Sequence, residues 1–178
     1  MFFKFEHVPP AFSLGIIIPI TKHVSNCNGD RFSEYRRITI SPVLSKVFEL
    51  CILENIKKFL VTSDLQLGFK KGLGCNHAIY IVREVVNYFT TNNSTVNLCA
   101  IDLTKAFDRV NYFLLFSKLM DRNIPHNVIV LLLRWYSNST AMVRWNACMS
   151  SAVPISAGVR QGGVLSPSIC LLPLWMTC

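Results

Sequence analysis

Two aspartates stand near the middle of the chain, in the stretch A100-IDLTKAFDRV-110. Asp102 closes an apolar run, and we expect a strand over residues 96–103. A carboxylate at the end of a buried strand is costly unless a cation pairs with it. Asp102 and the backbone carbonyl of Leu103 are suited to a hard metal ion. The alternatives are that Asp102 pairs with Lys105 or caps the next helix.

Two further stretches have residues that suit a nucleotide or another phosphate ligand. G158-VRQGGVLSP-167 offers the Gln161 side chain and the backbone amides of Gly162 and Gly163, which could lie against a sugar, a base or a phosphate. G68-FKKG-72 offers two lysines as point charges for a triphosphate. Each stretch, taken alone, also fits an ordinary turn or a solvated basic loop.

Composition narrows the class of protein. The net charge is +8 over 178 residues, which favours a polyanionic partner, nucleic acid before an anionic membrane. Apolar residues make up 51% and charged residues 16%, so most surfaces are buried or part of a larger fold is absent. Seven cysteines contain no C-x-x-C pair, which indicates reduced intracellular thiols. No segment is long and apolar enough to span a membrane, so we expect no membrane partner.

The expected elements mix helices and strands in one α+β domain. We expect Ser41 to cap a helix with Pro42 at its first position, and Asn111 to cap another. The expected strands are 14–22, 96–103 and a hairpin within 140–156, with polar loops at 26–37 and 90–95. The expected helices are 41–60, 77–89, 111–120, 125–137 and a last one beginning at Ser166 and cut short by Pro173.

Four blocks, taken in order, resemble the reverse transcriptase domain of non-LTR (LINE-type) retrotransposons. They are Y35-RRITISPVLSKVFE-49, Q66-LGFKKG-72, A100-IDLTKAFDRV-110 and G158-VRQGGVLSP-167. The resemblance runs over residues 15–172, and its third and fourth blocks are specific. It implies the fingers (about 15–95) and a partial palm (about 96–172) of a right-hand polymerase fold, between an N-terminal tail (1–14) and a divergent tail (173–178).

The resemblance also implies roles for individual residues. Asp102 matches the first catalytic, metal-binding aspartate, with Leu103 lending its carbonyl. Phe107, beside Ala106, matches the aromatic residue that packs under the incoming sugar. The nucleotide and template would be contacted by Gln161 and Gly162, and the triphosphate would lie near Lys70. The implied reaction joins a primer 3′-hydroxyl to a dNTP on an RNA template, with two Mg²⁺ ions.

Several features depart from the family. The aromatic-x-Asp-Asp signature is missing, and all ten carboxylates lie at or before Asp121. Arg37 and Arg160 stand where the family usually has proline. We therefore expect a domain truncated before the second catalytic motif and inactive alone, whose intramolecular partners would be the missing remainder of the palm and the thumb.

Other interpretations stay open. The chain could be a non-enzymatic, basic nucleic-acid-binding fragment, a decayed pseudogene fragment that folds poorly, or a relative of group II intron maturases. The resemblance implies an intracellular location, in the nucleus or the cytoplasm, without deciding between them.

Overall fold

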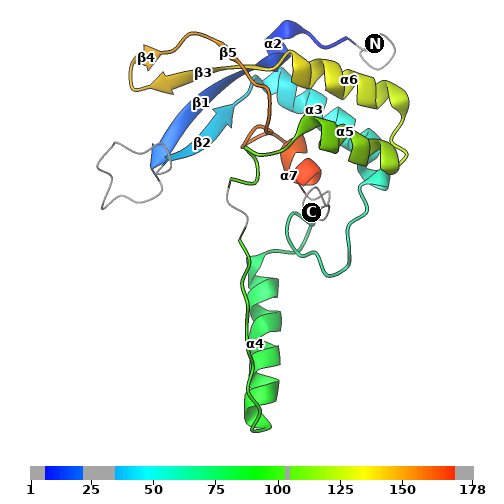
Figure 1. Ribbon diagram of the computed structural model, residues 1–178, viewed down its shortest axis with the longest axis vertical. Helices are drawn as coiled ribbons and strands as arrows, with labels where there is room; N and C mark the ends of the chain where they lie inside the picture. Colours follow the sequence, from blue (N-terminus) through cyan, green and yellow to red (C-terminus); the bar gives the residue numbers. More distant parts are fainter. Residues whose placement is uncertain (1–6, 22–34, 103–104, 171–178) are drawn as a thin grey trace. The chain divides into compact units, whose positions relative to one another are not determined.

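The computed structural model describes residues 7–21, 35–102 and 105–170 (Figure 1). They belong to two compact units, one formed by residues 1–60 together with 106–178 and the other by residues 61–105. Within its described residues the first unit contains α2 (Pro10–Ser13), β1 (Leu14–Thr21), β2 (Tyr35–Ile40), α3 (Val43–Ile56), η2 (Lys57–Phe59), α5 (Tyr112–Asp121), α6 (His126–Ser137), β3 (Thr140–Trp145), β4 (Cys148–Met149), β5 (Val153–Pro154) and α7 (Leu165–Cys170).

The first unit is built on a mixed sheet with the order β2-β1-β3-β4, in which β5 also pairs with β3 (Figure 1). β1 is antiparallel to β2, with Ile16 opposite Ile40, and parallel to β3, with Leu14 opposite Thr140. The expected strand at 14–22 and the hairpin within 140–156 are confirmed. The loop expected over 26–37 is wrong at its end, because β2 begins at Tyr35; residues 22–34 lie outside the described part.

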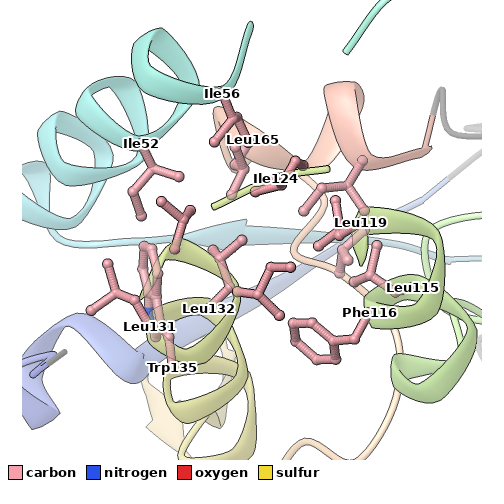
Figure 2. Close-up of a cluster of buried hydrophobic side chains, with 14 of the residues drawn as sticks. Ile52, Ile56, Leu115, Phe116, Leu119, Ile124, Leu131, Leu132, Trp135 and Leu165 are labelled. Carbon is pink, nitrogen blue, oxygen red and sulfur yellow. The ribbon is translucent and has the colours of Figure 1, made fainter. Parts of the chain in front are cut away.

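Four helices of the first unit enclose one hydrophobic core. Figure 2 shows side chains from α3, α5, α6 and α7 converging on it. Ile52 on α3 and Leu132 on α6 have no exposed surface. Trp135 is buried among them, and its indole nitrogen donates a hydrogen bond to the Phe12 carbonyl at 3.2 Å, which ties α6 to α2.

The helix termini follow the sequence signals in one case and not in another. Asn111 caps α5 as expected, because its Oδ1 accepts the Phe113 amide at 2.8 Å. Ser41 does not cap α3: Pro42 occupies that position without a side-chain cap. The Ser41 hydroxyl instead accepts a hydrogen bond from Arg160 at 3.4 Å.

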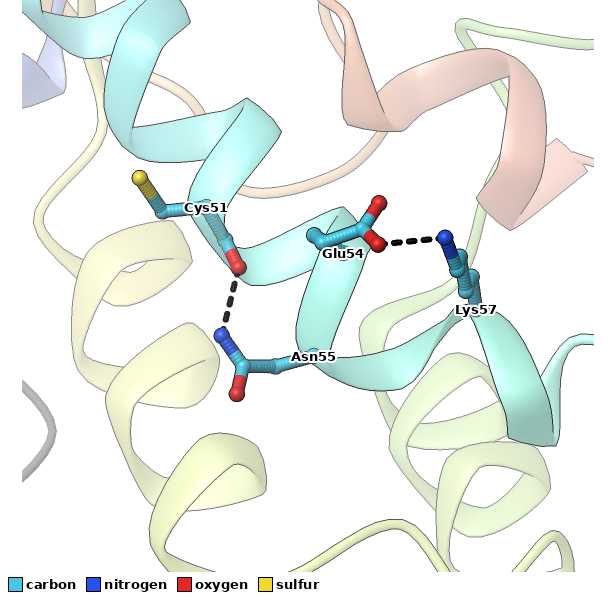
Figure 3. A network of polar contacts seen from close by, with 4 residues as sticks. All are labelled: Cys51, Glu54, Asn55 and Lys57. Atoms are coloured by element: carbon cyan, nitrogen blue, oxygen red, sulfur yellow. Dashed lines mark hydrogen bonds and ion pairs between the residues drawn. The ribbon is translucent and has the colours of Figure 1, made fainter.

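The end of α3 and the first residue of η2 carry an exposed polar network (Figure 3). Asn55 donates from its side-chain amide to the Cys51 carbonyl at 2.7 Å, and Lys57 pairs with Glu54. Because these side chains face solvent, the ion pair adds little stability. The helix expected over 41–60 is shorter in the structure. α3 ends at Ile56, and the chain continues as the short η2 turn.

The helix that the structure describes in the second unit is α4 (Cys75–Thr91), which confirms the helix expected over 77–89. The strand expected over 96–103 is wrong, because residues 96–102 are irregular. No strand in the described part of the chain pairs with this run, and an unpaired strand leaves its backbone groups without partners. Residues 103–104 lie outside the described part.

The helices of the described residues do not have the dimensions of membrane spans. None of them combines the length and the apolar character that a crossing requires.

Candidate functional site

The glycine-rich loop, residues 158–163, lies against the aromatic turn, residues 106–110. The Gly158 amide donates to the Val110 carbonyl at 2.9 Å, and the Val159 amide donates to the Phe107 carbonyl at 2.7 Å. Gly158 has φ +85°, and a Cβ there would lie 2.9 Å from the carbonyl oxygens of Phe107 and Asp108. Only glycine fits this close approach of two backbones.

The other side of the glycine-rich loop lies against β2. The Thr39 amide donates to the Gln161 carbonyl at 2.8 Å. Gly162 has φ +110°, and a Cβ there would lie 2.9 Å from the Thr39 carbonyl oxygen. The loop therefore bridges the aromatic turn and the sheet, which are distant in sequence.

A cavity of about 140 Å³ adjoins the glycine-rich loop, with walls from the sheet, the aromatic turn, α5 and α6. Tyr112 lies in this wall, and its hydroxyl donates to the Gly158 carbonyl at 3.0 Å. Its ring meets that of Tyr136 edge to face at 5.2 Å. Burial raises the pKa of Tyr112 to about 12, against a smaller opposing effect of the Arg160 guanidinium. The phenol is therefore a neutral donor at physiological pH.

Arg37 and Asp108 form an ion pair at the edge of this cavity. The pair joins β2 to the aromatic turn. Its side chains are 51% and 33% exposed, respectively, so solvent screens much of the attraction. Asp108, the second aspartate of the A100–V110 stretch, therefore has an arginine as the partner of its carboxylate.

Beside the loop lie Glu49, which is buried, and Arg160, which is partly buried, and the sequence pattern had assigned neither a role in the site. Arg160 donates to the carbonyls of Phe12, at 3.0 Å, and Ser13. Glu49 is 4% exposed, and its Oε2 accepts the amides of Val164 and Leu165 at the start of α7. Desolvation lowers the pKa of Arg160, while the Glu49 carboxylate acts to raise it. The available signals were Glu49 within the largely apolar helix α3 and the arginine at position 160, where the family usually has proline.

Four predicted site residues come together in the first unit. Phe107 is partly buried and packs on the hydrophobic core, with Ala106 before it in the same turn. Gln161 lines the cavity, and Gly162 follows it in the glycine-rich loop. The roles assigned to these residues stay predictions, although the two sequence blocks that contain them are in direct contact.

The remaining predicted residues belong to the second unit. Lys70 is partly buried, and its ammonium donates to the Ser63 carbonyl at 2.7 Å. Asp102 is exposed on irregular backbone. Leu103 lies outside the described residues.

The described residues do not provide the donor set that a metal ion needs. Nowhere in the ranges 7–21, 35–102 and 105–170 do three histidine, cysteine, aspartate or glutamate residues gather as metal ligands would. Exposed Asp102 alone does not fit a two-ion magnesium site, which needs several oxygen ligands.

Comparison with known proteins gives the family. Residues 20–174 match the family described as "Reverse transcriptase (RNA-dependent DNA polymerase)". The chain is 29% identical, over 92% of its length, to a probable RNA-directed DNA polymerase from transposon X-element of Drosophila melanogaster. It is 27% identical, also over 92%, to the RNA-directed DNA polymerase from mobile element jockey of that species. It is 24% identical, over 53%, to the transposon TX1 uncharacterized 149 kDa protein of Xenopus laevis.

These alignments cover only a small part of the relatives. The chain spans 18% of the X-element and jockey proteins and 8% of the TX1 protein. The family match nevertheless extends over most of the present chain and contains both the aromatic turn and the glycine-rich loop. The chain thus belongs to the reverse transcriptase (RNA-dependent DNA polymerase) family and is related to the polymerases of non-LTR retrotransposons.

Proposed function

We propose that this chain supplies the fingers, about residues 15–95, and part of the palm, about 96–172, of an RNA-directed DNA polymerase. The whole enzyme would join a dNTP to a primer 3′-hydroxyl on an RNA template. One observation carries the proposal: the glycine-rich loop is hydrogen-bonded to the aromatic turn on one side and to β2 on the other. Two segments that the family uses at its nucleotide site thus form one surface.

The proposed task of this surface is to hold and orient a nucleotide. Phe107 would lie under the sugar, and Gln161 with Gly162 would contact the nucleotide and the template strand. Polar backbone and amide groups near an apolar ring suit a nucleoside, whose base and sugar have both characters. Lys70 would act on the triphosphate as a point charge.

The template and primer would be held mainly by charge. The chain has 18 lysine and arginine residues against 10 acidic ones, and phosphate contacts dominate the affinity of proteins for nucleic acids. The second candidate function is that of a basic nucleic-acid-binding fragment. Such a fragment would bind the template and primer with an affinity that a dNTP does not change.

Magnesium supplies the family's nucleotidyl-transfer chemistry, but these residues do not form its site. Asp102 is the only carboxylate assigned to the metal, and no two aspartates are adjacent anywhere in the sequence. We infer that a polypeptide of these 178 residues binds substrates without polymerising. A primer-extension assay with Mg²⁺ or Mn²⁺ tests this, and template-dependent DNA synthesis by the purified chain would contradict it.

The binding part of the proposal has its own experiment. Fluorescence anisotropy would follow a labelled DNA primer on an RNA template as the 178-residue chain is added. A dNTP complementary to the next template base should tighten the complex, and a non-complementary dNTP should not. Equal affinity with either nucleotide would leave only the basic nucleic-acid-binding function.

A further inference from the structure

Arg160 makes contacts that an exposed loop residue would not make. Its guanidinium donates to the carbonyls of Phe12 and Ser13, where α2 meets β1, and to the Ser41 hydroxyl before α3. Phe12 also accepts the indole N–H of Trp135 at 3.2 Å. One side chain from the glycine-rich loop therefore reaches the point where the first strand and two helices meet.

The position of this cation, partly withdrawn from water, costs free energy. Burial disfavours the charged guanidinium, and desolvation is the main cause that lowers the pKa of Arg160. The Glu49 carboxylate opposes this effect and is itself held by the amides of Val164 and Leu165. Opposite charges withdrawn from water often add less stability than apolar packing of the same volume, and their best-attested use is to select one arrangement.

In this chain the two charges lie at the two ends of the turn that carries Gln161, so the conformation of this turn is what they fix. The Gly163 amide donates to the Arg160 carbonyl at 3.1 Å, which closes a tight turn around Gln161 and Gly162. A Cβ on Gly163 would lie 3.2 Å from Glu49 Oε2, so Glu49 supports the end of the same turn. The Arg160 side chain anchors the beginning of the turn, and Glu49 anchors its end.

We propose that Arg160 is a positioning residue, whose partly buried guanidinium fixes the glycine-rich loop on the α2–β1 junction and so holds Gln161 where it meets a nucleotide. The inference rests on the proposed function, because it names the group that sets the geometry of that site. Arg160 itself need not touch the nucleotide.

Amide hydrogen exchange measures the anchoring directly. The Thr39 amide, bonded to the Gln161 carbonyl, and the Gly163 amide, bonded to the Arg160 carbonyl, both report on the loop. In Arg160→Met their exchange should rise by roughly tenfold or more, while core amides such as that of Leu115 change much less. Arg160→Lys, which keeps the charge, should recover part of the protection, and Arg144→Met on β3 is the control for loss of an exposed arginine.

The same variants are then tested with the primer, the RNA template and the complementary dNTP. Arg160→Met should lose most of the nucleotide-dependent tightening but keep most of its affinity for the nucleic acid alone, which rests mainly on phosphate contacts. Arg160→Lys should recover part of the tightening. Exchange that rises equally at Leu115 and in the loop would show a merely general structural role and overturn the inference. Exchange that does not rise in the loop would show that Arg160 does not anchor it, and would overturn the inference as well. Localised exchange with unchanged nucleotide tightening would also overturn it. If the wild type shows no nucleotide effect, the proposed function fails first, and the failure is recognised before any variant is compared.

Discussion

The Val159 amide donates a hydrogen bond to the Phe107 carbonyl at 2.7 Å. This bond joins the glycine-rich loop to the aromatic turn, the two most specific sequence blocks of the chain. A second bond, from the Thr39 amide to the Gln161 carbonyl, lies on the other side of the loop. Together the two bonds fix the position of the glycine-rich loop in the candidate site. Changes in these backbone contacts should therefore disturb the site more than changes of comparable size elsewhere.

Gly158 tests the contact between the two backbones. Gly158→Ala should lower the free energy of unfolding by about 2–4 kcal/mol, because it combines a strained positive φ with a clash against backbone atoms. The clash arises because the new Cβ would lie 2.9 Å from the Phe107 and Asp108 oxygens. Urea denaturation followed by tryptophan fluorescence measures the change.

Gly72 is the matched control, since it has φ +80° but no atom within 4 Å of the position that a Cβ would take. Gly72→Ala carries only the conformational cost, about 1 kcal/mol. Equal losses in the two variants would mean that the aromatic turn moves aside easily and that the loop is not closely fitted to it.

Tyr112 should make stability depend on alkaline pH. Its pKa is raised to about 12 in the folded chain by burial, against about 10 in the unfolded chain. The folded state therefore favours the protonated phenol, and this contribution is fully present below pH 10 and is lost as the pH rises through 12. Urea midpoints of the wild type should fall over this window.

Tyr112→Phe removes both the titrating group and the hydrogen bond to the Gly158 carbonyl. At neutral pH it should cost about 1 kcal/mol, and the stability difference from the wild type should shrink above pH 10. A difference that stays constant up to about pH 11.5 would show that Tyr112 ionises as freely in the folded chain as in the unfolded one.

Two adjacent leucines on α6 test the hydrophobic core. Leu132 has no exposed surface, whereas Leu133 is 45% exposed. Leu132→Ala should destabilise the chain by about 2–5 kcal/mol through the lost packing and the cavity left behind. Leu133→Ala should change stability by less than about 1 kcal/mol. Similar small losses in both variants, measured by thermal unfolding, would indicate a loosely packed core.

The local parts of the fold could be read from the sequence. Asn111 before an apolar run predicted the cap of α5, and the side chain makes that cap. The spacing of apolar residues predicted α4 and α6. These signals depend on neighbours along the chain, so they need no knowledge of the tertiary structure.

The parts that depend on distant partners could not be predicted in this way. The apolar run at 96–101 suggested a strand, but a strand also needs a neighbour, and the described sheet offers none to it. β2 was missed because Arg36 and Arg37 made its beginning resemble a polar loop. The bonds between Arg160 and the α2–β1 junction join residues that only the fold brings together.

The proposed nucleotide site is tested most directly through Gln161. The primer–template affinity would be measured with the complementary and a non-complementary dNTP, for the wild type, Gln161→Ala and the exposed control Asn127→Ala on α6. We predict that only the complementary dNTP tightens the wild-type and Asn127→Ala complexes. Gln161→Ala should lose this tightening, whereas its affinity for the nucleic acid alone, which comes mainly from phosphate contacts, should fall by much less. Tightening that survives in Gln161→Ala would contradict the assignment of the glycine-rich loop to the nucleotide.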